Sequence, residues 1–155
     1  MKVRTGSYTI YNNVELEIYS LREQMDFPLE EQKFSACYEL STGLRFPDFF
    51  YSQGLMCKHV HFSELSNVFF IKTFGLYNGL VVQLFTYYAK PEKVCISLKD
   101  EIAAERYGFL KLSTGYEKMV ESKELEKVWE ERSRNDNFPG LSFPEGLERY
   151  KEIKL

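Results

Sequence analysis

The clearest pattern in the chain is a pair of runs rich in β-branched and aromatic residues on either side of Asn78-Gly79. A two-residue type I′ turn needs positive φ at both positions, and Asn and Gly adopt it at little cost. We therefore predict a β-hairpin over Val68–Tyr88, with Tyr77 opposite Leu80. Its second strand carries apolar side chains on both faces, which is typical of a central strand covered on both sides.

A second hairpin is predicted at the start of the chain, where Asn12-Asn13 stands between two alternating segments. A two-residue loop would place Tyr8 opposite Glu17, whereas a three-residue loop with Asn13 in the left-handed region would place Tyr8 opposite Leu16. Because the second register groups apolar side chains, we favour the three-residue loop.

Period-two alternation of apolar and polar residues predicts two further strands before the central hairpin. Lys33–Ser41 is the first, and we expect it to pair with the opening hairpin. Cys57–Phe62 is the second. Arg45–Gly54 is broken by Pro47, so it is either a short strand or an ordered loop.

The pattern after the central hairpin predicts one more strand and a short helix. Lys90-Pro91-Glu92-Lys93 predicts a turn that returns the chain through Val94–Leu98, which makes a three-stranded antiparallel meander. Ser97 has the position of an N-cap for a helix over Glu101–Arg106, and Gly108 would end that helix.

The segment from Phe109 to Val120 has two interpretations. It could form a hairpin around Thr114-Gly115, or a helix from Gly115 capped by Thr114 and Glu117. We place a break near Ser122 in either case.

A longer helix is predicted at Lys123–Ser133. Four residues would form the stripe that packs on the sheet: Leu125, Val128, Trp129 and Arg132. The predicted fold class is therefore α+β, an antiparallel sheet built from hairpins and a meander, with one short and one longer C-terminal helix packed on it. The chain is interpreted as a single α+β domain over residues 1–155 with an extended C-terminal tail from about residue 135, and no internal repeat is detected.

Composition narrows the functional classes. The 155 residues hold three cysteines, an odd number with no Cys-x-x-Cys spacing, and the N-terminus has no apolar signal core, so we expect a reducing cytoplasm. No apolar run reaches the roughly 18 residues needed to cross a bilayer, so we expect no membrane partner. A net charge of −3 with both signs interspersed disfavours direct binding of nucleic acid.

Cys57, His59 and His61 form the sharpest candidate for chemistry. On a strand, these alternate residues share one face, where histidine and cysteine could chelate one metal ion. No fourth ligand is evident, although Cys37, Cys95 or Glu64 could fold close to them. A metal-dependent enzyme or small-molecule binding protein that uses this strand is therefore the alternative function.

The sequence favours a protein that is not an enzyme and that holds no cofactor. Cys37 and Cys95 lie within apolar strand patterns, which are typical of buried, inert thiols. Gly-x-Ser-x-Gly, P-loop, Gly-x-Gly-x-x-Gly and His-Glu-x-x-His motifs are all missing from the sequence.

Acidic and aromatic residues in irregular segments indicate a surface for a protein partner. Such segments often display binding residues, and aromatic side chains are enriched at protein interfaces. The residues that we select for partner binding are Glu30, Glu31, Asp48, Phe50 and Tyr51.

Three stretches carry a family resemblance: Arg4-Thr5-Gly6-x-Tyr8-x-x-Tyr11-Asn12-Asn13-x-Glu15-x-x-Ile18, Tyr107-Gly108-Phe109, and Glu124-Leu125-Glu126-x-Val128-Trp129-Glu130-Glu131-Arg132. Together they resemble small immunity proteins that are encoded beside secreted polymorphic toxins in bacteria, including contact-dependent inhibition systems. The resemblance implies a cytoplasmic inhibitor that binds one cognate toxin domain and covers its active site or substrate groove. A nuclease would be one such toxin.

Overall fold

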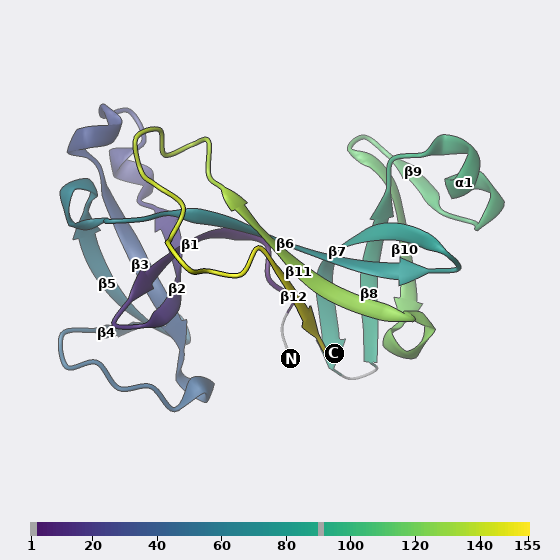
Figure 1. The fold of residues 1–155 in the computed structure, drawn as a ribbon, viewed down its shortest axis with the longest axis horizontal. Helices are drawn as coiled ribbons and strands as arrows, with labels where there is room; N and C mark the ends of the chain where they lie inside the picture. Colours follow the sequence, from purple (N-terminus) through teal and green to yellow (C-terminus); the bar gives the residue numbers. More distant parts are fainter. Residues whose placement is uncertain (1–2, 90–91) are drawn as a thin grey trace. The chain divides into compact units, whose positions relative to one another are not determined.

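The computed structural model describes residues 3–89 and 92–155, which form twelve strands, one α-helix and five short 3-10 turns (Figure 1). The strands are β1 (Gly6–Tyr11), β2 (Val14–Ser20), β3 (Lys33–Glu39), β4 (Phe50–Ser52), β5 (Leu55–His61), β6 (Phe69–Tyr77), β7 (Leu80–Ala89), β8 (Glu92–Leu98), β9 (Leu110–Leu112), β10 (Gly115–Glu121), β11 (Lys127–Arg134) and β12 (Tyr150–Ile153). The helix is α1 (Glu101–Arg106), and the 3-10 turns are η1 (Arg22–Gln24), η2 (Leu29–Glu31), η3 (Leu40–Thr42), η4 (Phe62–Glu64) and η5 (Ser122–Glu124).

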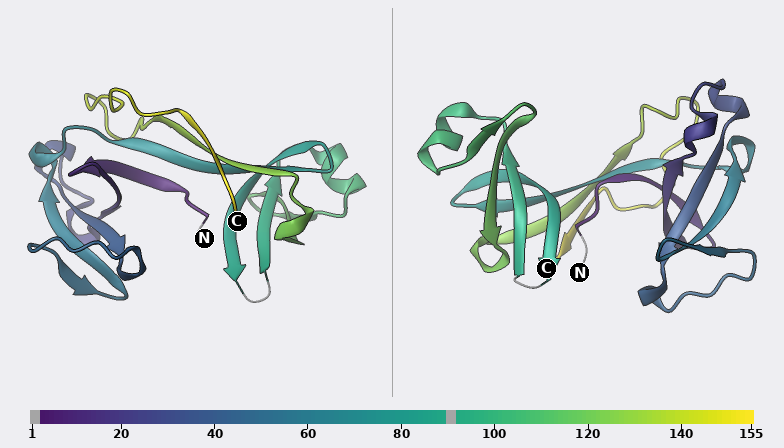
Figure 2. Two further views of the ribbon diagram at one scale, coloured as in Figure 1. Left: turned by 60° about the horizontal axis from the view of Figure 1, so that its bottom comes forward. Right: turned by 180° about the vertical axis from the view of Figure 1, so that it is seen from behind.

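The contacts of the chain divide it into two compact units. The first unit comprises Gly6–Phe70 and Ser133–Leu147, and the second comprises residues 3–5, Ile71–Arg132 and Glu148–Leu155. Strands of the first unit are hydrogen-bonded in the order β4-β5-β3-β2-β1, and those of the second in the order β9-β10-β8-β7-β6. Figures 1 and 2 show each set of strands from three directions.

The two units contain the same strand pattern at two places in the sequence. In the first unit, Tyr11 lies opposite Val14 across the turn between β1 and β2. In the second unit, Tyr77 lies opposite Leu80 across the turn between β6 and β7. The strand order of the first unit is thus matched, strand by strand, in the second.

The registers of the next strand pairs, β3–β5 and β8–β10, also match between the two units. Ala36 of β3 lies opposite Lys58 of β5. At the matching place in the second unit, Ile96 of β8 lies opposite Lys118 of β10. The same agreement holds at the short edge strands, where two-residue turns connect β4 to β5 and β9 to β10.

Both sets of strands end in the same local motif. A capping box between His61 and Glu64 opens η4, and one between Glu121 and Glu124 opens η5. An extended strand with a buried Val-aromatic pair follows each 3-10 turn: Val68-Phe69 and Val128-Trp129. The fold is therefore a tandem structural repeat, which the sequence analysis does not detect because few matched positions carry identical residues.

Each unit has its own hydrophobic core. Leu16, Phe34 and Val68 are almost completely buried in the first unit. Leu84 and Ile96 are completely buried in the second. In β8 buried and less buried positions alternate, whereas in β3 the buried residues run without a break from Phe34 to Tyr38, so β3 is covered on both faces.

The structure confirms the central hairpin and the meander. Asn78 and Gly79 have φ values of 49° and 75°, as a type I′ turn requires. The strand β8 follows as the third antiparallel strand, although Lys90 and Pro91 of the predicted turn lie outside the described residues. The predicted pairing of the 33–41 strand with the opening hairpin is also confirmed, by the β2–β3 ladder.

The predicted α+β class is wrong, because Lys123–Ser133 is not a helix. Its residues form η5 and then the strand β11, which pairs with β6 and β12. The backbone amide of Glu126 donates to the carbonyl of Leu76 at 2.9 Å, at the start of this pairing. Hydrogen bonds to strands distant in the sequence therefore override the high helix propensity of the Glu and Lys residues.

The predicted register of the opening hairpin is also wrong. Asn12 and Asn13 both have positive φ, so the loop has two residues and Tyr8 lies opposite Glu17. The apolar pattern does not decide this register, because both faces hold apolar side chains. Leu16 points into the core, while Tyr8 packs against Phe69 at a ring distance of 6.2 Å.

The helix α1, the 109–120 hairpin and the C-terminal segment agree only partly with the predictions. The helix α1 forms as predicted, but Asp100 rather than Ser97 is its N-cap and accepts a hydrogen bond from the Ala103 amide. The hairpin interpretation of the 109–120 segment is correct, with β9 and β10 as its strands. Residues after 135 include the strand β12, which the sequence analysis does not predict. No helix in the described residues is long and apolar enough to cross a membrane.

Candidate functional site

Three of the five residues selected for partner binding lie near one edge of the first unit. Asp48 precedes the edge strand β4, and its carboxylate pairs with the Lys58 ammonium at 2.5 Å. This hydrogen bond holds the pKa of Asp48 below its usual value. Phe50 and Tyr51 lie on β4 with 46% and 64% of their surface exposed. This edge therefore exposes two aromatic side chains beside an ion pair in which the two charges compensate each other.

The other two selected residues lie elsewhere in the same unit. Glu30 and Glu31 are exposed on η2, which packs beside η4 at the far end of β5. At about 3.3 Å per strand residue, the length of β5 separates η2 from β4 by more than a single side chain can span. The structure thus does not bring the five residues into one cluster.

The strand β5 places Cys57, His59 and His61 on one face, as predicted, but each is engaged locally. Cys57 is buried opposite Cys37. The His59 and Phe50 rings form a T-shaped pair at a centroid distance of 5.2 Å. The Nδ1 atom of His61 accepts a hydrogen bond of 3.1 Å from the Ser63 amide.

The described residues contain no group of three His, Cys, Asp or Glu side chains that could hold a metal ion. The metal-binding alternative therefore gains no geometric support from this strand.

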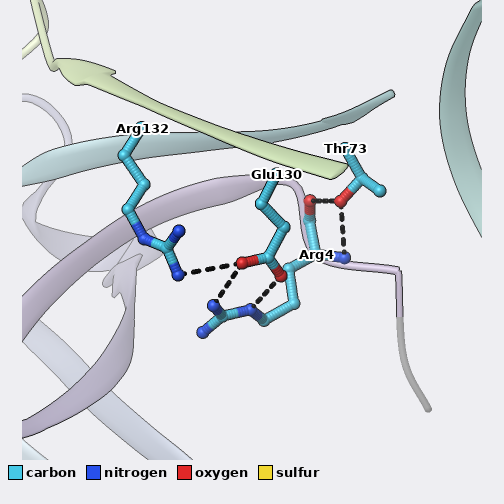
Figure 3. A network of polar contacts seen from close by, with 4 residues as sticks. All are labelled: Arg4, Thr73, Glu130 and Arg132. Carbon is cyan, nitrogen blue, oxygen red and sulfur yellow. Dashed lines mark hydrogen bonds and ion pairs between the residues drawn. The ribbon is translucent and has the colours of Figure 1, made fainter. Parts of the chain in front are cut away.

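An ionic network is buried in the second unit (Figure 3). Glu130 accepts hydrogen bonds from Arg4 Nε and Arg4 Nη2, each at 2.7 Å, and from Arg132 Nη2 at 2.9 Å. The side chain of Glu130 is 4% exposed and that of Arg132 is 2% exposed. Thr73 Oγ1 in turn bonds to the backbone of Arg4. Because the buried Glu130 carboxylate accepts from both guanidinium groups, the network serves to join the N-terminal segment to β6 and β11.

A further exposed feature, which sequence analysis does not identify, is an apolar surface on the second unit. Five large apolar side chains, each between 43% and 72% exposed, lie on the face of the sheet that points away from the core. We call this surface the apolar face, and it consists of Val81, Phe85, Leu110, Leu112 and Met119.

The sheet register shows that these residues share a face. Gln83 of β7, Ser97 of β8 and Glu117 of β10 lie in one row across the sheet, and Leu110 of β9 extends that row. Val81, Leu112 and Met119 stand two positions from members of this row, so they point the same way. Phe85 belongs to the bulge between Leu84 and Thr86 and is exposed, whereas Leu84 is completely buried.

The residues of the apolar face lie on β7, β9 and β10, and with β8 between them they span roughly 14 Å across the sheet. Polar side chains lie among them: Gln83, Ser97 and Glu117 form the central row, and the Cys95 thiol donates to Glu117 at 3.7 Å. Burial and the neighbouring Glu117 carboxylate raise the pKa of Cys95, so this thiol keeps its proton at neutral pH. A surface of exposed apolar side chains around a hydrogen-bonded polar centre is suited to a protein partner.

The first unit contains a pocket of about 490 Å³. Its lining includes Ile18, Met25, Leu29, Phe34 and Phe138. The lining contains no side chain that titrates near neutral pH, so the pocket has space for a small molecule but lacks a general acid or base.

Comparison with known proteins places the chain in one family. No curated protein and no solved structure gives a significant match to the chain. A family described as "Uncharacterised conserved protein UCP033725" matches residues 3–137, which include every strand except β12. The chain therefore belongs to the family of uncharacterised conserved proteins UCP033725.

Proposed function

We propose that this protein is a cytoplasmic immunity protein that binds a cognate secreted toxin domain and neutralises it by covering its active site. The observation that carries the binding function is the apolar face of the second unit. Exposed apolar residues gathered on one sheet face mark interaction sites more often than isolated ones do. The family resemblance of the opening and β11 segments supports a toxin as the partner.

The apolar face is the main contact surface in this proposal, and the β4 edge of the first unit is a second. Leu110 and Phe50 occupy matching positions of the structural repeat, since each lies on the short edge strand. They are 72% and 46% exposed. Aromatic side chains such as Phe50 are enriched at protein interfaces, and burial of Leu110 would add apolar area to the contact.

The net negative charge of the protein supports a nuclease as one possible kind of toxin. The protein carries a net charge of −3, and Glu30 and Glu31 lie exposed in the first unit. If the toxin is a nuclease with a basic cleft, this charge would speed association and orient the partner, while the apolar contacts would slow dissociation.

The test is co-expression with the toxic domain encoded beside this protein, with cell growth and complex formation as the readouts. We expect the wild-type protein to restore growth and to form a one-to-one complex. Absence of both rescue and binding would refute the immunity function.

Charge substitutions on the apolar face test the surface. Leu110→Glu and Met119→Glu should each weaken binding by at least about tenfold, since they place a carboxylate in a desolvated interface. The matched control is Ile102→Glu on α1, because Ile102 is 79% exposed and lies outside the sheet face.

The same assay with Phe50→Ala and Tyr51→Ala measures the contribution of the β4 edge. If binding is unchanged in both Glu variants and weaker in the alanine variants, the contact surface lies at the β4 edge and not on the apolar face.

A further inference from the structure

The strands β3 and β5 hold two thiols in direct opposition. Cys37 and Cys57 are opposed residues of this antiparallel ladder, with 4% and 5% of their surface exposed, and both are free thiols. Opposed residues of antiparallel strands have Cα atoms roughly 4.5–5.5 Å apart. A disulfide needs Cα atoms within about 4.4–6.8 Å, so the backbone already meets this requirement.

The structural repeat shows that the sheet itself does not require this pair. Ser97 and Glu117 occupy the matching opposed positions of the second unit. A hydroxyl and a carboxylate are therefore compatible with the same strand register, and the paired thiols are a property of the first unit.

We propose that Cys37 and Cys57 form a reversible disulfide that joins β3 to β5, by thiol–disulfide exchange with a low-molecular-weight disulfide. The Cys57 thiolate attacks one sulfur of the small disulfide, which breaks its S–S bond and releases one small thiol. Cys37 then attacks Cys57 Sγ and displaces the second small thiol. The two cysteine sulfurs are oxidised by two electrons in total, the small disulfide is reduced, and the two cysteine protons pass to the departing thiolates.

The environment of the two thiols gives them different roles. Burial and a hydrogen bond to Cys57 raise the pKa of Cys37 to about 12, and Ser35 Oγ lies 3.2 Å from Cys37 Sγ. Cys57 lies nearer the sheet edge, where it is flanked by β4 with Phe50 in the opposed position. Separation of the three-residue strand β4 from β5 would expose Cys57 first, so Cys57 is the sulfur that meets the small disulfide.

The bond would close the segment between Cys37 and Cys57 into a loop. That loop includes β4 with Phe50 and Tyr51, so oxidation would restrict the motion of the β4 edge. This chemistry is independent of the proposed binding of a toxin.

The experiment uses the folded Cys95→Ser variant, in which Cys37 and Cys57 are the two remaining cysteines. The probe is oxidised glutathione. We expect the intact mass to fall by two hydrogens, a digest to contain the Cys37 and Cys57 peptides linked, and dithiothreitol to restore the original mass. Adding Phe50→Ala should speed the reaction several-fold, because the side chain opposite Cys57 on the edge strand β4 is shortened.

Three outcomes would overturn the proposal. One is a stable glutathione adduct without an internal bond. Another is no reaction of the folded protein over a period in which the urea-unfolded variant is fully oxidised. A third is a rate unchanged by Phe50→Ala, which would contradict the assigned route of access. A Cys37→Ala substitution in the same background should stop at the glutathione adduct, and circular dichroism verifies that each variant is folded.

Discussion

Arg4 donates two hydrogen bonds of 2.7 Å to Glu130, although 126 positions separate the two residues in the chain. The bidentate geometry uses the planar guanidinium group, which matches a carboxylate in a way that lysine cannot. Arg132 donates to the same carboxylate, so one buried Glu130 side chain joins the start of the chain to its last third (Figure 3).

Glu130→Gln should destabilise the protein by on the order of 3–5 kcal/mol. The substitution removes the negative charge that faces two guanidinium groups, and breaking a buried ion pair leaves an uncompensated charge. Urea unfolding measures the change. Glu105→Gln on the exposed face of α1 is the matched control and should change stability by less than about 0.5 kcal/mol. Equal stability of the two variants would show that the network contributes nothing.

Gly79→Val should destabilise the protein by at least about 1 kcal/mol, because a β-branched residue is strained at the φ of 75° that Gly79 adopts. Thermal unfolding gives the comparison with wild type. Gly79→Asn is the control and should cost less, since Asn tolerates this region. A melting curve for Gly79→Val that overlays the wild-type curve would contradict the type I′ turn.

Trp129→Ala should cost on the order of 3–5 kcal/mol, as expected for removal of a buried aromatic ring. The ring is 9% exposed and stacks on Phe74 at a centroid distance of 6.1 Å, while its Nε1 donates to Glu131 at 3.0 Å. Trp129 is the only tryptophan in the sequence, so fluorescence reports on it alone. Strong quenching by iodide in the folded protein would contradict this burial.

Protein purified without added metal should hold no stoichiometric zinc, iron or copper. His61 Nδ1 is already engaged by the Ser63 amide and Cys57 is buried beside Cys37, so neither is free to complete a shared coordination sphere. Elemental analysis checks this expectation. One equivalent of metal that is lost in a His59→Ala, His61→Ala double variant would instead favour the metal-dependent alternative.

Local sequence determined the elements whose signals lie within a few residues. Asn78-Gly79 sets its turn because both residues adopt positive φ at little cost, and the hairpin follows from the runs beside it. The helix α1 has the same origin, with Asp100 and Gly108 at its ends. The five partner-binding residues are predicted from residue type and from their place in irregular segments. Neither property tells which of these segments are adjacent in the fold. Glu30 and Glu31 therefore proved distant from Phe50.

Tertiary structure decided the rest, because its determinants lie far apart in the sequence. The helix propensity of the Glu- and Lys-rich segment 123–133 predicts a helix. In the folded protein this segment instead forms backbone hydrogen bonds with β6 and β12, and Glu130 accepts hydrogen bonds from Arg4. The apolar face exists because strand pairing brings β7, β10 and β9 into one sheet. Cys37 and Cys57 are likewise ordinary strand residues by sequence, and only the β3–β5 register places their thiols opposite each other.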